Sequence, residues 1–110
     1  MDELTEKPPL RLDELPASYT IELLNPIVFG GGTWTEITLR EPMVKERQQA
    51  EQHLRNGNMP HAQSLYQMAL IAKVSGVPMP VVQRMPVRKV NEAMFYLSGF
   101  LFGGLPTGEI

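Results

Sequence analysis

The sequence has 110 residues, of which 43% are hydrophobic and 20% are charged, and its net charge is −2. This length matches one domain of ordinary globular composition, and the net charge provides no general attraction to nucleic acid or to anionic lipid. The sequence contains no cysteine, which excludes disulfides, thiolate metal sites and cysteine nucleophiles.

The first residues are acidic and contain Pro8, Pro9 and Pro16. Proline interrupts both helices and sheet ladders, so residues 1–18 are predicted to be a mobile or loosely docked arm and residues 19–110 a single domain of a hairpin and helices. The arm lacks the basic and apolar regions of a secretory signal, and no apolar run approaches the roughly 18 residues of a membrane span. We therefore expect a soluble cytoplasmic protein without a membrane contact.

Two β-rich segments follow the arm, on either side of three glycines. The first covers residues 19–24 and 27–29, with a bend at Asn25-Pro26, and the second covers residues 33–39. Together with the glycines they predict a β-hairpin. Thr35, Ile37 and Leu39 are expected on one face of the second strand, and Trp34 on the other. The glycines are not predicted to bind phosphate, because no Lys-Ser or Lys-Thr pair follows them.

Three helices and a short helical turn are predicted after the hairpin. A polar helix is predicted over residues 43–55, with Pro42 at its first position. A second helix is predicted over residues 60–75; it is apolar on several sides and should be central. Residues 80–86 lie between prolines and have room for little more than one turn, and residues 87–102 form the last helix. The predicted fold class is therefore α+β, with an N-terminal hairpin and a mainly helical body.

The last predicted helix carries more apolar residues than one face can bury. Five of them recur at spacings of three and four residues, namely Val87, Val90, Met94, Leu97 and Leu101. Four aromatic residues lie partly outside this stripe, namely Phe95, Tyr96, Phe100 and Phe102. A short chain has little interior, so part of this surface is expected to contact a partner or a second copy of the chain.

The residues do not indicate catalysis or metal binding. His53 and His61 are the only histidines, and they lack the spacing and the third ligand of a metal site. A nucleophile, a base and an orienting group cannot be assembled, so neither an enzymatic activity nor a cofactor is expected. Arg84, Arg88 and Lys89 form a local basic cluster, for which DNA binding is the weaker interpretation because the whole chain is acidic.

The order of the elements resembles the small tail assembly chaperones of contractile-tailed phages and prophages. The segment that carries most of the resemblance is Thr-Glu-Ile-Thr-Leu-Arg-Glu-Pro at residues 35–42, joined to a glycine-turn hairpin. Shorter matches are Leu-Asn-Pro at residues 24–26, Val-Ser-Gly-Val-Pro at residues 74–78 and Arg-Met-Pro at residues 84–86. The resemblance extends over about residues 20–102.

This resemblance implies a protein that binds the tape measure protein and keeps it soluble while tail tube subunits polymerise around it. The tail tube protein is a second candidate partner. The resemblance also implies action in the cytoplasm of the bacterial host and absence from the mature virion. Two alternatives remain open: a structural tail or adaptor component that stays in the virion, and a small nucleic-acid-binding regulator that uses the basic cluster.

The residues assigned to partner binding come from the apolar helices and from the strand-to-helix junction. They are Arg40, Glu41, Met68, Met94, Phe95, Phe100, Leu101 and Phe102. Together with Met43, the methionines and aromatics are expected to form a groove, since flexible thioethers suit a client with repeated, non-identical helical segments. For Arg40 and Glu41 the favoured interpretation is structural, with Arg40 paired to an acid, and a partner contact is the alternative.

Overall fold

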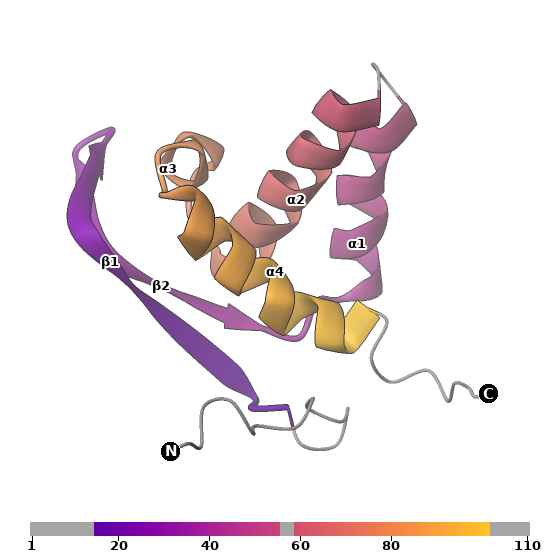
Figure 1. Cartoon of the computed structure of the whole chain (residues 1–110), viewed down its shortest axis with the longest axis horizontal. Coiled ribbons are helices and arrows are strands. Elements are labelled where there is room, and N and C mark those ends of the chain that lie inside the picture. Colours follow the sequence, from indigo (N-terminus) through magenta and orange to yellow (C-terminus); the bar gives the residue numbers. More distant parts are fainter. Residues whose placement is uncertain (1–14, 56–58, 102–110) are drawn as a thin grey trace.

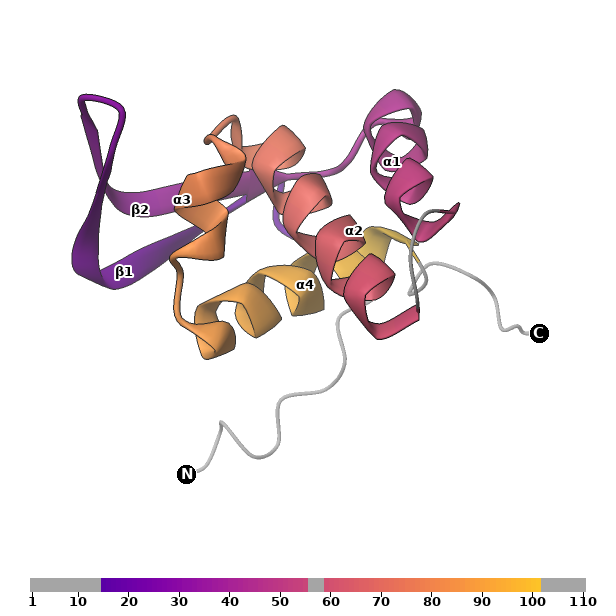
Figure 2. The same cartoon turned by 90° about the horizontal axis from the view of Figure 1, so that it is seen from above.

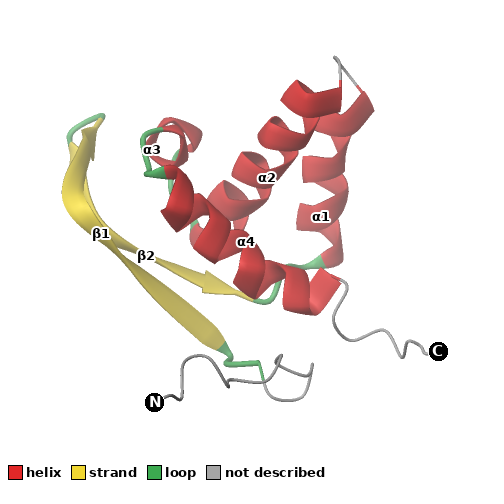
Figure 3. Cartoon of the chain, in the orientation of Figure 1, coloured by secondary structure: helices red, strands yellow, loops and turns green. Residues whose placement is uncertain are grey.

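A computed structural model of the chain describes residues 15–55 and 59–101 (Figure 1). The elements in chain order are β1 (Ser18–Phe29), β2 (Gly32–Arg40), α1 (Val44–Glu51), a 3-10 turn η2 (Gln52–Arg55), α2 (Met59–Ser75), α3 (Met79–Gln83) and α4 (Val87–Leu101). Both strands precede all of the helices in the chain, and Figure 3 shows the two strands beside a body of helices. The predicted α+β fold is confirmed, and α3 is the predicted short helical turn.

β1 and β2 form an antiparallel hairpin. Gly30 and Gly31 make the turn with φ angles of 57° and 83°, a backbone conformation that other residues rarely adopt. The ladder is interrupted between the Glu22–Glu36 and Ile27–Trp34 pairs, so residues 23–26 lie opposite Thr35 alone. Pro26 has no amide hydrogen to donate to the ladder, which accounts for a bulge at this position. In Figure 2 the hairpin is strongly bent rather than flat.

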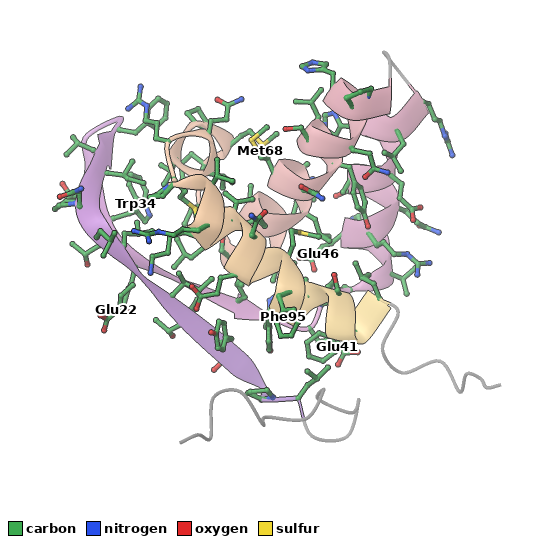
Figure 4. The ribbon with its side chains drawn as sticks, viewed as in Figure 1. Glu22, Trp34, Glu41, Glu46, Met68 and Phe95 are labelled. Carbon is green, nitrogen blue, oxygen red and sulfur yellow. The ribbon has the colours of Figure 1, made fainter. Side chains whose placement is uncertain are left out.

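The bulge changes which side chains of β2 face the helices. Ile37 and Leu39 are both buried, on one face as predicted, but Thr35 is exposed, and Trp34 packs partly buried against the core. Figure 4 shows Trp34 on the side of the hairpin that faces the helices and Glu22 on the outer side. Thr35 was predicted to share a face with Ile37 and Leu39, and Trp34 to lie on the other face. This prediction was wrong, because strict alternation requires an unbroken ladder.

α2 is the central helix, as predicted. It contacts α1, η2, α3, α4 and β2, and Leu70 and Ile71 are fully buried. The helix ends at Ser75 because Gly76 adopts a φ of 77° and donates its amide hydrogen to the carbonyl oxygen of Ala72 at 2.8 Å.

α1 begins later than predicted. Its N-cap is Met43, so Pro42 lies just before the cap rather than at the first helical position. Glu46 determines this boundary, because its Oε1 accepts a hydrogen bond from the amide of Met43 at 2.9 Å.

α4 lies beside the hairpin (Figure 1) and contacts β1, β2 and α2. Its buried residues are Ala93, Tyr96 and Leu97, whereas Val87 is 74% exposed. Val87, a member of the predicted stripe, is therefore exposed, and Tyr96, which was predicted to lie partly outside the stripe, is buried. The reason is that α4 packs against β1 as well as α2, which turns its buried face toward Tyr96.

The start of the described chain is attached to α4. The hydroxyl of Tyr96 donates a hydrogen bond to the carbonyl oxygen of Pro16 at 2.6 Å, and the side chain of Leu15 lies over Gly99. Ser18 is the first residue of β1. Residues 1–14 lie outside the described residues, so the mobile arm stays a prediction for them.

Candidate protein-interaction surface

Six large apolar side chains are exposed among the described residues. They are Leu24, Val28, Met43, Val44, Val87 and Phe95. Single exposed apolar residues are normal on a protein surface, but neighbouring ones indicate contact with another molecule. Three of them, Met43, Val44 and Val87, lie beside hollows on the helical side of the molecule.

The first hollow on the helical side has a volume of about 200 Å³ and lies between α2, α3 and α4. Its apolar lining consists of Met68, Val82, Met85, Val87 and Val90. Met68 and Val90 are partly buried against the core, and Figure 4 shows Met68 on α2. The predicted binding residue Met68, which belongs to α2, thus lies beside the N-terminal end of α4.

The second hollow has a volume of about 150 Å³ and lies between the start of α1 and the end of α4. It is lined by Glu41, Pro42, Met43, Val44, Arg47, Phe100 and Leu101. This hollow brings together three predicted binding residues, Glu41, Phe100 and Leu101, although they are far apart in the sequence. It also places Met43 beside them, as the predicted groove requires.

The two hollows lie along α4 at opposite ends. Val90, Met94 and Leu101 are separated by one and two helical turns, so Met94 lies on the same side of α4 between the hollows. Phe95 follows Met94 and is 74% exposed on the outer side of the helix. Phe95 lines neither hollow, but it belongs to the same helix, so we call the two hollows together with Met94 and Phe95 the α4 groove. Phe102 was also assigned to this surface, and it lies outside the described residues.

Arg40 is held by a carboxylate. Its Nη1 and Nη2 donate to Oε1 and Oε2 of Glu46 at 3.0 and 2.6 Å, and Nη1 also donates to the backbone carbonyl of Glu41 at 3.1 Å. The hydrogen bond from Arg40 is the main cause that lowers the pKa of Glu46. The favoured interpretation of Arg40, a strand-to-helix junction paired with an acid, is confirmed. Glu41 remains available, with its side chain at the second hollow.

Phe100 has a structural role in addition to lining the groove. Its ring packs edge-on against Tyr96 with centroids 5.2 Å apart, and Tyr96 stacks on Tyr19. The hydroxyl of Tyr19 donates a hydrogen bond to Glu92 at 2.6 Å, which is the main cause of the raised pKa of Tyr19. Burial is the main cause of the raised pKa of Tyr96.

Two members of the basic cluster are engaged in contacts within the fold. Arg84 donates from Nη1 to the carbonyl oxygen of Val28 at 2.8 Å and lies 5.4 Å from the ring centroid of Phe29, so it holds the hairpin tip. Lys89 lies 4.0 Å from Glu92, and Arg88 has no ion pair within the described ranges. Phosphate binding uses several free cations together, so this arrangement does not favour nucleic acid.

Residues 15–55 and 59–101 contain neither a cluster of metal-ligand side chains nor a helix that could span a membrane. Histidine and acidic side chains do not gather there into a group of three that could hold a metal ion. Over the same ranges, the helices are too short or too polar to cross a lipid bilayer.

The comparison with protein families identifies the class of this chain. Residues 20–101 match the family described as phage tail assembly chaperone proteins, E, or 41 or 14. Since the match extends over most of the sequence, the chain belongs to this family of phage tail assembly chaperones. The suspected resemblance is thereby confirmed. No curated protein and no solved structure matches the chain.

Some features of this surface were missed from the sequence. The contact of Leu15 with Gly99 joins residues far apart in the chain and has no local signal. The exposure of Leu24 and Val28 was also missed, although the Asn25-Pro26 pair was a signal for an irregular strand with residues turned outward.

Proposed function

We propose that this protein is a non-catalytic tail assembly chaperone that binds the tape measure protein through the α4 groove. The observation that carries the proposal is the exposure of Phe95, which is 74% exposed on α4, the helix whose two ends line the two hollows. Membership of the tail assembly chaperone family supports the general role. The tape measure protein stays soluble in the complex until tail tube subunits polymerise around it.

The chemistry of the groove suits a helical client. Met43, Met68 and Met94 have flexible thioethers that adapt to different apolar side chains, and an amphipathic helix can place its apolar face along α4. Burial of apolar surface contributes about 25 cal/mol per Å², less the cost of ordering the partners. Binding takes place in the cytoplasm of the bacterial host, and the chaperone dissociates from the tape measure protein before the virion is complete.

The test is co-expression of the tape measure protein with the full chain or with variants of it. We expect the native chain to keep the client soluble, and Phe95→Asp and Met43→Asp to lose this effect, because both side chains are exposed and a carboxylate opposes apolar burial. Gln63→Asp, an exposed position on α2, is the matched control and should behave like the native chain.

Three results would contradict parts of this proposal. If the tape measure protein is equally soluble without the chaperone, it is not the client, and the tail tube protein is then the next candidate. Retention of binding by both Phe95→Asp and Met43→Asp places the client elsewhere on the surface. Detection of the protein in purified virions by mass spectrometry favours the structural tail or adaptor component. Light scattering of the free protein shows whether a second copy competes for the groove.

A further inference from the structure

A second hollowed surface lies on the other side of α4, between this helix and the bulge of β1. One hollow of about 340 Å³ is lined by Leu24, Arg88, Lys89 and Glu92. A second hollow, of about 280 Å³, is lined by residues 25–28 with Arg84 and Pro86. Their lining residues are neighbours in the chain, since Leu24 precedes residue 25 and Pro86 is two residues before Arg88. We call this surface the bulge patch.

The floor of the bulge patch is partly apolar. Leu24 and Val28 are each 62% exposed, and they lie on either side of Asn25-Pro26. Residues 23–26 have only Thr35 opposite them in the ladder, so this part of β1 is not paired along its length with β2. A bulge of this kind turns side chains away from the regular pleat. Here it places two large apolar residues on the surface.

The rim of the patch is basic in a chain whose net charge is −2. Arg84, Arg88 and Lys89 are the cations, and Glu92 is the one acid that lines either hollow among the described residues. Arg84 is occupied by Val28 and Phe29, and Lys89 is near Glu92. Arg88 is exposed and has no ion pair within residues 15–55 and 59–101. The patch therefore combines an exposed cation, which has no ion pair among the described residues, with a partly apolar floor.

We infer that the bulge patch binds an acidic segment of the client, with apolar side chains against Leu24 and Val28 and a carboxylate facing Arg88. This inference rests on the proposed function and adds a second contact to the α4 groove. Charge complementarity selects the partner, since an acidic segment is attracted to Arg88 and a basic one is repelled. The apolar floor favours a peptide over nucleic acid, whose phosphates gain nothing from Leu24 and Val28.

The experiment compares the affinity of the full chain and its variants for the purified tape measure protein at low and high salt. We expect Arg88→Glu to weaken binding about fivefold at low salt, the upper range for one exposed ion pair, and the difference should shrink at high salt. Leu24→Asp should weaken binding at both salt concentrations. Arg55→Glu makes the same change of charge at an exposed position in η2 and should leave the affinity unchanged.

The outcomes separate this inference from the proposed function. If the native chain does not bind the client, both fail. If Phe95→Asp abolishes binding while Arg88→Glu and Leu24→Asp match the native chain, the function stands and the bulge patch is not used. If Arg88→Glu binds more tightly, the patch is occupied by the chain's own residues 1–14, which carry five acids and two bases, and the inference is wrong. DNA binding that Arg88→Glu removes would also overturn it.

Discussion

Tyr96 of α4 stacks on Tyr19 of β1, with ring centroids 5.1 Å apart and ring planes 17° from parallel. This pair fixes the helix that carries the groove to the start of the hairpin. Both hydroxyls also donate hydrogen bonds, Tyr96 to the carbonyl oxygen of Pro16 and Tyr19 to the carboxylate of Glu92. The position of α4 therefore depends on the hairpin and not only on the neighbouring helices.

Substitutions at Tyr96 separate the ring from the hydroxyl. Tyr96→Phe removes the hydrogen bond to Pro16 and should lower the free energy of unfolding by about 1 kcal/mol. Tyr96→Ala also removes the stacked ring from a site that is 3% exposed, and should cost about 3 kcal/mol or more. Urea denaturation measures both. Equal losses for the two variants would show that the ring contributes nothing.

The substitution Gly99→Ala is expected to be tolerated, but it should displace the side chain of Leu15. A Cβ atom at Gly99 would lie 2.9 Å from both Cδ atoms of Leu15, so this side chain must move. Alanine favours the helix by up to about 1 kcal/mol over glycine, which offsets the lost contact. We expect Gly99→Ala to change stability little while the NMR signals of the Leu15 methyl groups shift. Unchanged methyl signals would contradict the observed contact.

The ion pair at the start of α1 predicts a dependence of stability on pH. The pKa of Glu46 is lowered, first by the hydrogen bond from Arg40 and further by the amide of Met43, although burial opposes the change. A lowered pKa in the folded state means that the stabilisation is complete above the ordinary value of 4.5. It is lost as the pH falls below that value and through the lower pKa of the folded state.

The variant Glu46→Gln tests this dependence. It removes the charge and should cost about 1 kcal/mol near neutral pH, in the range of a helix cap and an exposed ion pair. The difference in stability between native chain and variant should decrease as the pH falls below 4.5. Glu36→Gln, on the exposed face of β2, is the control. A difference that stays constant down to the lowest pH would contradict the role of the charge.

The hairpin turn allows a stabilising substitution. Gly30 has a φ of 57°, and an added Cβ atom would meet nothing within 4 Å. Asparagine tolerates this conformation and is common at the first position of a two-residue hairpin turn, so Gly30→Asn should stabilise the fold by up to about 1 kcal/mol. Gly31→Val, at a φ of 83°, should instead destabilise it by about 1 kcal/mol or more. Thermal unfolding checks the opposite signs.

The predictable parts of this fold depend on local chemistry. The glycine turn, the end of α2 at Gly76 and the pairing of Arg40 with an acid each follow from a few neighbouring residues. The buried face of α4 was not predictable, because the choice of Tyr96 over Val87 depends on Tyr19 in a distant strand. Trp34 was misplaced for a similar reason, since the bulge that turns it inward arises in the opposite strand.

The candidate surface was predictable in composition but not in arrangement. The excess of apolar residues on the last helix was visible in the sequence, and Phe95 is indeed exposed. The sequence did not show that Phe100 is held by Tyr96 or that Met68 and Leu101 lie beside different hollows. These features depend on how α1 and α2 pack beside α4, and the spacing within one helix contains no information about its neighbours.

Phe95 and Phe100 are expected to respond differently to the same substitution. Phe95→Asp should change the free energy of unfolding by less than about 0.5 kcal/mol, because the side chain is 74% exposed. Phe100→Asp should cost about 3 kcal/mol, because a carboxylate would replace a ring that packs against Tyr96. Loss of client binding in Phe100→Asp is therefore ambiguous, whereas the same loss in a stably folded Phe95→Asp assigns the effect to the surface. Strong destabilisation by Phe95→Asp would show that this ring is part of the core.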